Sequence, residues 1–435
     1  MARIGKVASI GLAALGLLYV VSWLQTPTPA QREALAAMRQ PEPTPAGSNA
    51  FVDAWTIDYD LTAAERERIA RADIARFDPT RPESIAFTPG VATATQRQQP
   101  AYLDERLCLR DGGSCLQRVQ QQRAVVQALL QPHAGLLART RAVLEAHDYL
   151  ASPFPPGPGM PFLIQPVARG SDLIRTQAAL DFNAGRQAEA LAATCRLVDG
   201  WRKWLHASEF PIDQMIGATQ VATTLELQAS MLAQMPSDAA PIGACGNMRN
   251  VPVLEKSATC RVAKGELRLR QVFVAFGDYA NSDPSPARRQ LHRALVRPEN
   301  TVAATASALS PACEDAFVDA MRSDIRVPSP PRFSLLQLQC VANLAGCQEL
   351  HRPASLPTYQ RQLQDYRARM KVMATLWWLR DTATDTRPVA ERLPHRPEAL
   401  RQGRPIALVD GRLQIEQYDR AGSVVWSVPL PAGSR

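Results

Sequence analysis

The chain has 435 residues, of which 46% are apolar and 21% are charged, so it is long enough to bury a substantial core. This balance excludes a disordered chain and a many-pass membrane protein. Its 35 prolines interrupt any long helical rod, and its 8 cysteines are too dilute for a small disulfide scaffold.

The formal net charge of +8 raises the question of nucleic-acid binding. Most of the excess lies in residues 352–404, which carry 11 basic and 5 acidic side chains. No continuous basic run and no glycine-aromatic platform accompanies it. We therefore predict no nucleic-acid partner and interpret most of these cations as lying on solvated faces.

The first predicted element is a membrane anchor. Residues 1–6 carry two cations and no acid, and residues 7–24 are uncharged, with Tyr19 and Trp23 near their outer end. A spanning helix needs about 20 apolar residues, and roughly 17 suffice. Cations before the stretch favour a cytoplasmic N-terminus, and aromatic residues are typical of a membrane interface. We expect a cytoplasmic tip at 1–6 and an uncleaved transmembrane anchor at 7–24; cleavage as a signal peptide is the alternative.

After the anchor, residues 25–50 are rich in proline and predict a semi-rigid linker with about one helical turn near residues 33–39. Residues 51–386 are predicted to form an irregular multi-helix periplasmic domain. Its first helix begins with a capping box, Thr62 followed three residues later by Glu65. The fold class expected for the whole chain is mainly α.

The period of apolar residues predicts further helices, in chain order, at residues 116–131, 134–150, 171–185, 187–206, 212–235, 333–350 and 358–381. The connector at 153–166 holds six prolines and two glycines, so no helix is expected within it. Gly185 is predicted to end a helix as its C-cap. The methionine-aromatic stripe of 358–381 is interpreted as core packing.

Residues 387–435 change pattern and predict a small antiparallel β-unit. Asp410-Gly411 is a hairpin turn between two short alternating runs, and residues 424–430 supply a third strand. Three short strands are marginally stable alone, so we expect them to dock on the helices, beside residues 358–381.

The eight cysteines of an exported chain predict disulfides, although sequence does not choose among the pairings. They are Cys108, Cys115, Cys195, Cys245, Cys260, Cys313, Cys340 and Cys347. Proximity along the chain favours the pairs Cys108–Cys115, Cys245–Cys260 and Cys340–Cys347, which leaves Cys195–Cys313.

No motif for a catalytic, cofactor-binding or metal-binding residue is found, so we predict none of these. Asp53, Asp58 and Asp60 form the nearest approach to an acidic metal cluster, but helix capping by Asp60 is the favoured interpretation. His147 precedes Asp148 and Tyr149, and capping of a helix end is favoured over acid-base chemistry.

Two resemblances add to this picture. Residues 177–198 resemble half of a tetratricopeptide repeat, without any 34-residue recurrence. With Leu393-Pro394 and the Arg396 to Leu400 segment before its β-unit, the layout resembles uncharacterised single-pass inner-membrane proteins of Gram-negative bacteria. That resemblance implies an inner-membrane location with the bulk of the chain periplasmic, and it implies no activity.

The sequence therefore favours a membrane-anchored, non-catalytic binding, adaptor or immunity-type protein with an envelope protein as partner. A periplasmic hydrolase with an unrecognised site is the alternative. A structural envelope element that uses residues 352–404 against anionic headgroups is a third interpretation.

Overall fold

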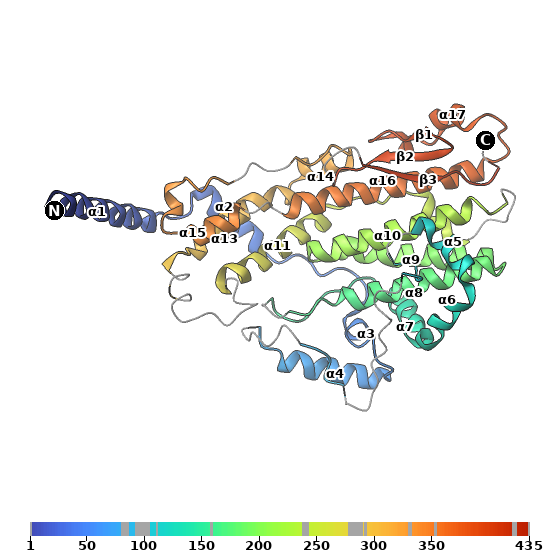
Figure 1. The fold of residues 1–435 in the computed structure, drawn as a ribbon, viewed down its shortest axis with the longest axis horizontal. Coiled ribbons are helices and arrows are strands. Elements are labelled where there is room, and N and C mark those ends of the chain that lie inside the picture. The colour runs from blue at the N-terminus through green and yellow to red at the C-terminus, as the bar shows by residue number, and fades with distance from the viewer. Residues whose placement is uncertain are drawn as a thin grey trace.

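The protein is mainly helical and ends in a small antiparallel sheet (Figure 1). The computed structural model describes residues 2–79, 87–91, 105–109, 112–156, 160–236, 243–276, 290, 294–328, 333–351, 355–419 and 424–433. The α-helices are α1 (Ala2–Leu24), α2 (Pro29–Arg39), α3 (Phe51–Trp55), α4 (Ala63–Arg76), α5 (Gly112–Gln121), α6 (Arg123–Leu130), α7 (Ala134–Ala146), α8 (Ile164–Asn183), α9 (Gln187–Ala207), α10 (Pro211–Leu232), α11 (Lys256–Phe276), α13 (Pro298–Leu309), α14 (Asp315–Arg322), α15 (Leu344–His351), α16 (Ser355–Asp381), α17 (Val389–Arg392) and α18 (Glu398–Arg401). Short 3-10 turns are η2 (Gln131–His133), η3 (Gly243–Arg249), η5 (Ser310–Cys313), η6 (Leu338–Cys340) and η7 (Leu393–His395).

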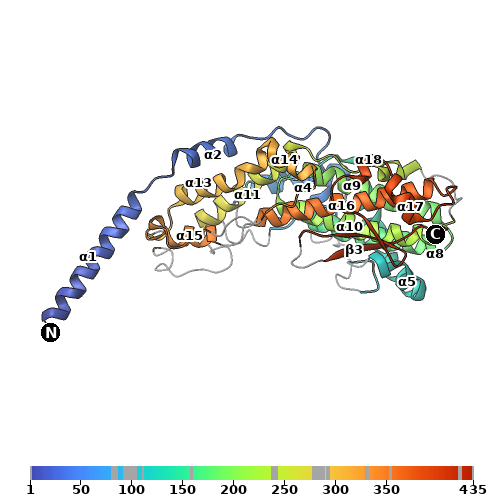
Figure 2. The same ribbon diagram turned by 90° about the horizontal axis from the view of Figure 1, so that it is seen from above.

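Helix α1 projects from one end of an elongated body, and the C-terminus lies at the opposite end (Figures 1 and 2). Side chains of α1 are described from Ala13 onward, and most of its large apolar side chains are exposed there. Over the described residues, none of the helices is both long enough and apolar enough to cross a membrane.

The proline-rich linker is more ordered than the sequence predicts. Thr28 caps α2 through a full capping box with Gln31, and Pro29 stands at the first helical position, where its missing N–H is not needed. The helix therefore runs for 11 residues instead of one turn. It packs along α13 and α11, because Met38 on its last turn is buried among their apolar side chains.

A large hydrophobic core, the main core, fills the space between α8, α9, α10 and α16. Trp201, Trp204 and Trp377 are among its largest fully buried side chains. The stripe of residues 358–381 is buried there, as predicted. Gly185 has a φ of +89° at the turn between α8 and α9, which confirms its expected role at a helix end.

Among the predicted helices whose bounds change in the structure, three differ most. Helix α8 already starts at Ile164, inside the proline-rich connector, because Pro166 lies in the first turn, where helical N–H groups have no partner. The predicted helix at 116–131 is broken at Gln122 into α5 and α6. Residues 333–350 are not one helix, because α15 begins only at Leu344.

A second, smaller core lies at the α1 end of the body, and we call it the proximal core. It is built by one side each of α2, α11 and α13, with Val262, Leu267, Val302 and Leu309 among its buried residues. The two cores divide the helical body into a part near α1 and a part far from it.

The predicted β-unit is confirmed. Strands β1 (Ala407–Val409), β2 (Arg412–Glu416) and β3 (Val425–Pro429) are antiparallel in the order β1-β2-β3. Asp410 and Gly411 both have positive φ, as a two-residue hairpin turn requires. Strand β2 docks on α16 as predicted, whereas β3 lies on α10. Their buried side chains belong to the main core.

Candidate functional site

All eight cysteines are paired in the structure. The pairs are Cys108–Cys115, Cys195–Cys245, Cys260–Cys313 and Cys340–Cys347. The predictions for the two short-range pairs are confirmed, but the predicted pairs Cys245–Cys260 and Cys195–Cys313 are wrong. Tertiary packing determines these two pairs. The turn η3 lies on α9 and brings Cys245 to Cys195, and α11 packs on η5 and brings Cys260 to Cys313.

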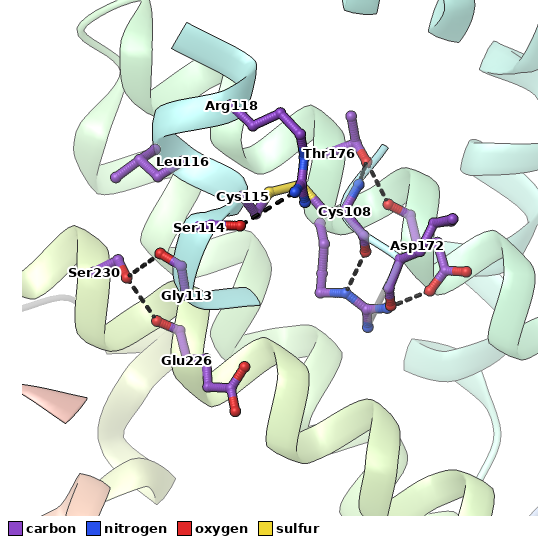
Figure 3. The surroundings of a disulfide bond; sticks show 12 residues. Cys108, Gly113, Ser114, Cys115, Leu116, Arg118, Asp172, Thr176, Glu226 and Ser230 are labelled. Atoms are coloured by element: carbon purple, nitrogen blue, oxygen red, sulfur yellow. Dashed lines mark hydrogen bonds and ion pairs between the residues drawn. A yellow bond between two sulfur atoms is a disulfide. The ribbon is translucent and has the colours of Figure 1, made fainter. Parts of the chain in front are cut away.

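The Cys108–Cys115 disulfide lies where α5 meets α8 and α10 (Figure 3). Thr176 accepts a hydrogen bond from the Cys108 amide at 2.9 Å, and Ser230 donates to the Gly113 carbonyl at 3.2 Å. A Cβ on Gly112 would lie 2.0 Å from the Thr223 carbonyl oxygen, so only glycine allows this approach to α10. Both sulfurs are fully buried, so this disulfide is structural.

The acidic residues near the first helices are held by cations. Asp53, Asp58 and Asp60 pair with Arg66, Arg169 and Arg139, at 2.8, 3.3 and 3.5 Å respectively. Asp60 is not the cap of α4; Thr62 is, in a capping box with Glu65 as predicted. Within the described residues, no group of three or more His, Cys, Asp or Glu side chains could hold a metal ion.

His147 caps the end of α7, as predicted, with its amide bonded to the Val143 carbonyl. Its Nε2 lies 2.8 Å from Asp53 Oδ2, an approach that the sequence did not indicate. Its Nδ1 is buried, and no described residue forms a hydrogen bond with it. The neighbouring Asp148 instead accepts from the Ser48 amide, so these adjacent residues do not share a site.

The arginines of residues 352–404 are less solvated than predicted. Arg404 is 5% exposed and pairs with Asp324 at 2.9 Å and Asp365 at 2.5 Å. Arg392 donates to the Leu379 carbonyl from a buried position. These cations hold the β-unit and the α17 turn to α16, so they are not a free surface for anionic headgroups.

A cavity of about 440 Å³ separates the segment after α2 from the helical body. We call this segment, residues 40–49, the strap. Residues of α11 line it as well, together with Tyr149, Ala151 and Glu209. The volume falls within the range of small-molecule and peptide pockets, about 300–1,000 Å³.

The strap crosses the cavity in an extended form because of its sequence. Pro41, Pro43 and Pro45 fix their own φ near −65° and drive the residue before each of them out of the helical region. Proline has no backbone N–H, so this part of the strap has more carbonyl acceptors than amide donors. Residues 40–45 therefore present carbonyls and the Glu42 carboxylate to α11.

Three cations on one face of α11 line the cavity, and two of them, Arg261 and Lys264, contact the strap. Lys264 forms an ion pair with Glu42 and donates to the Gln40 carbonyl at 2.9 Å. Arg261 donates to the Pro43 carbonyl at 3.4 Å and to the His206 carbonyl at 3.5 Å. Arg268 pairs with Glu209 at 3.5 Å. With Arg39, four cations and two acids line the cavity.

Arg261 has a hydrogen-bond donor that no described residue uses. It is 8% exposed, and its Nε is buried without a hydrogen-bond partner in the described structure. A buried guanidinium N–H without a partner costs free energy, and a ligand oxygen would satisfy it. The Cys260–Cys313 disulfide fixes this turn of α11, and Glu42 Oε1 lies 3.3 Å from Cys260 Sγ.

Glu209, which lines the strap cavity, interacts with a second carboxyl group, Asp213. A Cβ on Gly265 would lie 1.7 Å from the Glu209 carbonyl oxygen, so glycine lets α11 touch the corner between α9 and α10. Glu209 also lines a neighbouring cavity of about 20 Å³, together with Asp213. Burial, and then the charge of Glu209, raises the pKa of Asp213 to about 7. Burial lowers the pKa of His206 to about 4.

Sequence reasoning missed this cavity, although two signals were present. The alternation of proline with other residues in 40–45 indicates an extended segment, and Arg261, Lys264 and Arg268 follow helical spacing. Only the packing of α2 on the body brings the two together.

Known proteins give no further guide. No family model matches the chain, and no curated protein or solved structure is significantly similar to it.

Proposed function

We propose that the protein is a non-catalytic binding protein of the cell envelope that takes an extended, acidic segment of a partner protein in the strap cavity. One observation carries the proposal: the strap itself is such a segment, with Glu42 paired to Lys264 and two of its carbonyls on α11 cations. The unused Arg261 Nε and the excess of cations suit an acidic ligand.

The location is part of the same proposal. The uncharged stretch 7–24 begins before the first described side chain, so the anchor is inferred from sequence, with the N-terminus cytoplasmic and the remainder periplasmic. Four disulfides support an oxidising compartment. We expect a C-terminal alkaline phosphatase fusion to be active and a cytoplasmic reporter fusion to be silent; the reverse would refute this topology.

Binding is tested with the full chain and a labelled peptide, Gln-Pro-Glu-Pro-Thr-Pro, which has the sequence of residues 40–45. Lys264→Met should weaken its binding about tenfold, because a charge-assisted hydrogen bond is lost. Glu42→Gln should strengthen it, because the competing ion pair within the chain is weakened. Fluorescence anisotropy measures both effects.

Two controls make the test specific. Lys256 lies on the same helix, outside the cavity, and pairs with the exposed Asp315, so Lys256→Met should leave binding unchanged. A peptide with glutamine in place of glutamate should bind weakly. If both peptides bind equally, or if Glu42→Gln binds neither of them, the cavity does not recognise acidic segments.

A hydrolase is the second candidate, favoured by Asp213 alone. A carboxyl group with a pKa of about 7 beside a second carboxylate is the pattern of a general acid. The cavity at Asp213 holds about one water molecule, and Glu209 lines both this cavity and the strap cavity. Turnover of chromogenic ester or glycoside substrates that disappears in Asp213→Asn would favour this candidate.

A further inference from the structure

The segment of residues 334–347, which we call the apolar loop, is exposed although it carries no charge. Its 14 residues include no Asp, Glu, Lys or Arg. Its exposed apolar side chains are Leu335 (37%), Leu336 (98%), Leu338 (37%), Val341 (39%) and Leu344 (39%). Clustered exposed apolar side chains of this kind mark an interaction site.

The loop is held in place by a disulfide and by contacts to α13. The Cys340–Cys347 disulfide closes it. Asn343 accepts from the Arg297 amide at 2.6 Å and donates to Thr301 at 3.0 Å. A Cβ on Gly346 would lie 2.0 Å from Thr301 Oγ1, so the loop is seated closely on α13.

The apolar loop also touches the end of α1. The Ala342 amide donates to Ser22 Oγ at 2.9 Å, and Ser22 is buried by this contact. Trp23 is 41% exposed, and the Arg297 guanidinium lies 4.3 Å from the centroid of its ring. Helix α1 leaves the body beside α15, at the end of this loop (Figures 1 and 2).

We infer that the apolar loop docks into the surface of the lipid bilayer and holds the body against the membrane. The inference rests on the proposed anchoring by α1. If α1 spans the bilayer, Trp23 and Arg297 lie at headgroup level, where aromatic rings and cations are favoured. The exposed leucines beside them then lie at the boundary between headgroups and acyl chains, continuous with the apolar surface of α1.

Docking on the bilayer would explain why the apolar loop contains no charged residue. A surface that binds a protein partner reversibly usually has an apolar centre surrounded by a polar rim. The apolar loop contains no charged residue that could form such a rim. The bilayer interface needs none, because Leu336 and its neighbours are withdrawn from water by the lipid itself. Docking would also place the strap cavity, which adjoins the proximal core, close to the membrane surface.

The test uses the full chain in vesicles of phosphatidylethanolamine and phosphatidylglycerol whose acyl chains carry bromine, a contact quencher of indole fluorescence. Leu336→Trp adds a reporter to the loop. Val409→Trp is the matched control, because Val409 is also exposed and apolar (41%) but lies in β1, far from α1. The emission that each variant adds to the wild type is compared in brominated and plain vesicles.

Docking predicts that brominated lipid quenches the added emission at position 336 at least about twofold and leaves that at position 409 unchanged. Equal emission of the position 336 reporter in both vesicles overturns the inference, including when its emission is blue-shifted, which would indicate cover by protein. Sedimentation with vesicles after carbonate washing tests the anchor separately. Loss of the wild type from the membrane would refute the anchor, whereas a retained but unquenched protein refutes only the docking.

Discussion

The main core and the proximal core hold the same chain together by different means. The main core joins α8, α9, α10 and α16 to the β-unit and buries several tryptophans. Among the described residues, the proximal core buries 11 apolar residues, and the Cys260–Cys313 disulfide links α11 to η5, directly after α13. A small core buries little apolar surface, so burial alone offsets only a small part of the conformational entropy lost on folding. A disulfide stabilises such a core because it restricts the unfolded chain.

The difference has a functional consequence. Both proposed binding surfaces, the strap cavity and the apolar loop, lie on the proximal side. A region with few buried contacts opens at a lower free energy than the global unfolding of the molecule. Under the proposed function, we therefore expect the strap to exchange with a ligand while the main core stays folded.

The largest expected effect tests whether the β-unit belongs to the main core. Trp426 is 7% exposed, and its Nε1 donates to Glu226 at 2.8 Å. Trp426→Ala should lower the free energy of unfolding by about 3–5 kcal/mol, because a large buried ring is removed. Thermal unfolding measures it, with Val425→Ala on the exposed side of the same strand as control. An unchanged melting temperature would mean that the β-unit is a loose appendage.

The second effect separates the two cores. Replacing Cys260 and Cys313 by serine should cost about 2–4 kcal/mol, confined largely to the proximal core. Hydrogen exchange should then accelerate in α11 and α13, with α8 and α9 still protected. The matched removal of the Cys195–Cys245 disulfide should expose α9 and η3 instead. Simultaneous loss of protection in both regions would show that the cores unfold as one unit.

The third effect concerns the pH dependence of stability caused by Asp213, in the first turn of α10. The folded-state pKa of Asp213, about 7, lies above that of an unfolded aspartate, so the folded protein binds this proton more tightly. Asp213 therefore destabilises the fold progressively as the pH rises from about 4 to 7, and fully above 7. Asp213→Asn should raise stability at pH 8 by about 1 kcal/mol, a discounted value because the side chain keeps contact with solvent, and should have little effect at pH 4. Equal effects at both pH values in thermal unfolding would contradict this assignment.

The smallest effect compares two helix caps. Thr28→Ala removes the cap of α2 and should cost about 0.5–1 kcal/mol, which loosens the strap and strengthens binding of the Gln-Pro-Glu-Pro-Thr-Pro peptide. Thr62→Ala removes the same type of cap from α4 at similar cost. Because α4 does not line the strap cavity, peptide affinity should stay constant in that variant. A parallel change in both variants would indicate a general loss of stability.

Local patterns were sufficient for much of the fold. The helical spacing of apolar residues in 358–381, the Thr62–Glu65 box, Gly185 and the Asp410–Gly411 turn each act over a few residues, so the sequence predicts them directly. The short-range pairs Cys108–Cys115 and Cys340–Cys347 follow from proximity along the chain. The neutrality of residues 334–347 was equally visible, but its apolar residues also fit a helical period, so exposure was not foreseen.

Tertiary packing decided everything that joins distant segments. Cys195 reaches Cys245, and Cys260 reaches Cys313, only because η3 rests on α9 and η5 on α11. The strap meets Lys264 only because Met38 anchors α2 in the proximal core, more than 200 residues away along the chain. The hydrophobic effect is non-directional, so it does not specify which two segments pack together. The periodicity of apolar residues indicates which face of a helix is buried. Which other face it packs against is determined only when all apolar faces pack into one interior.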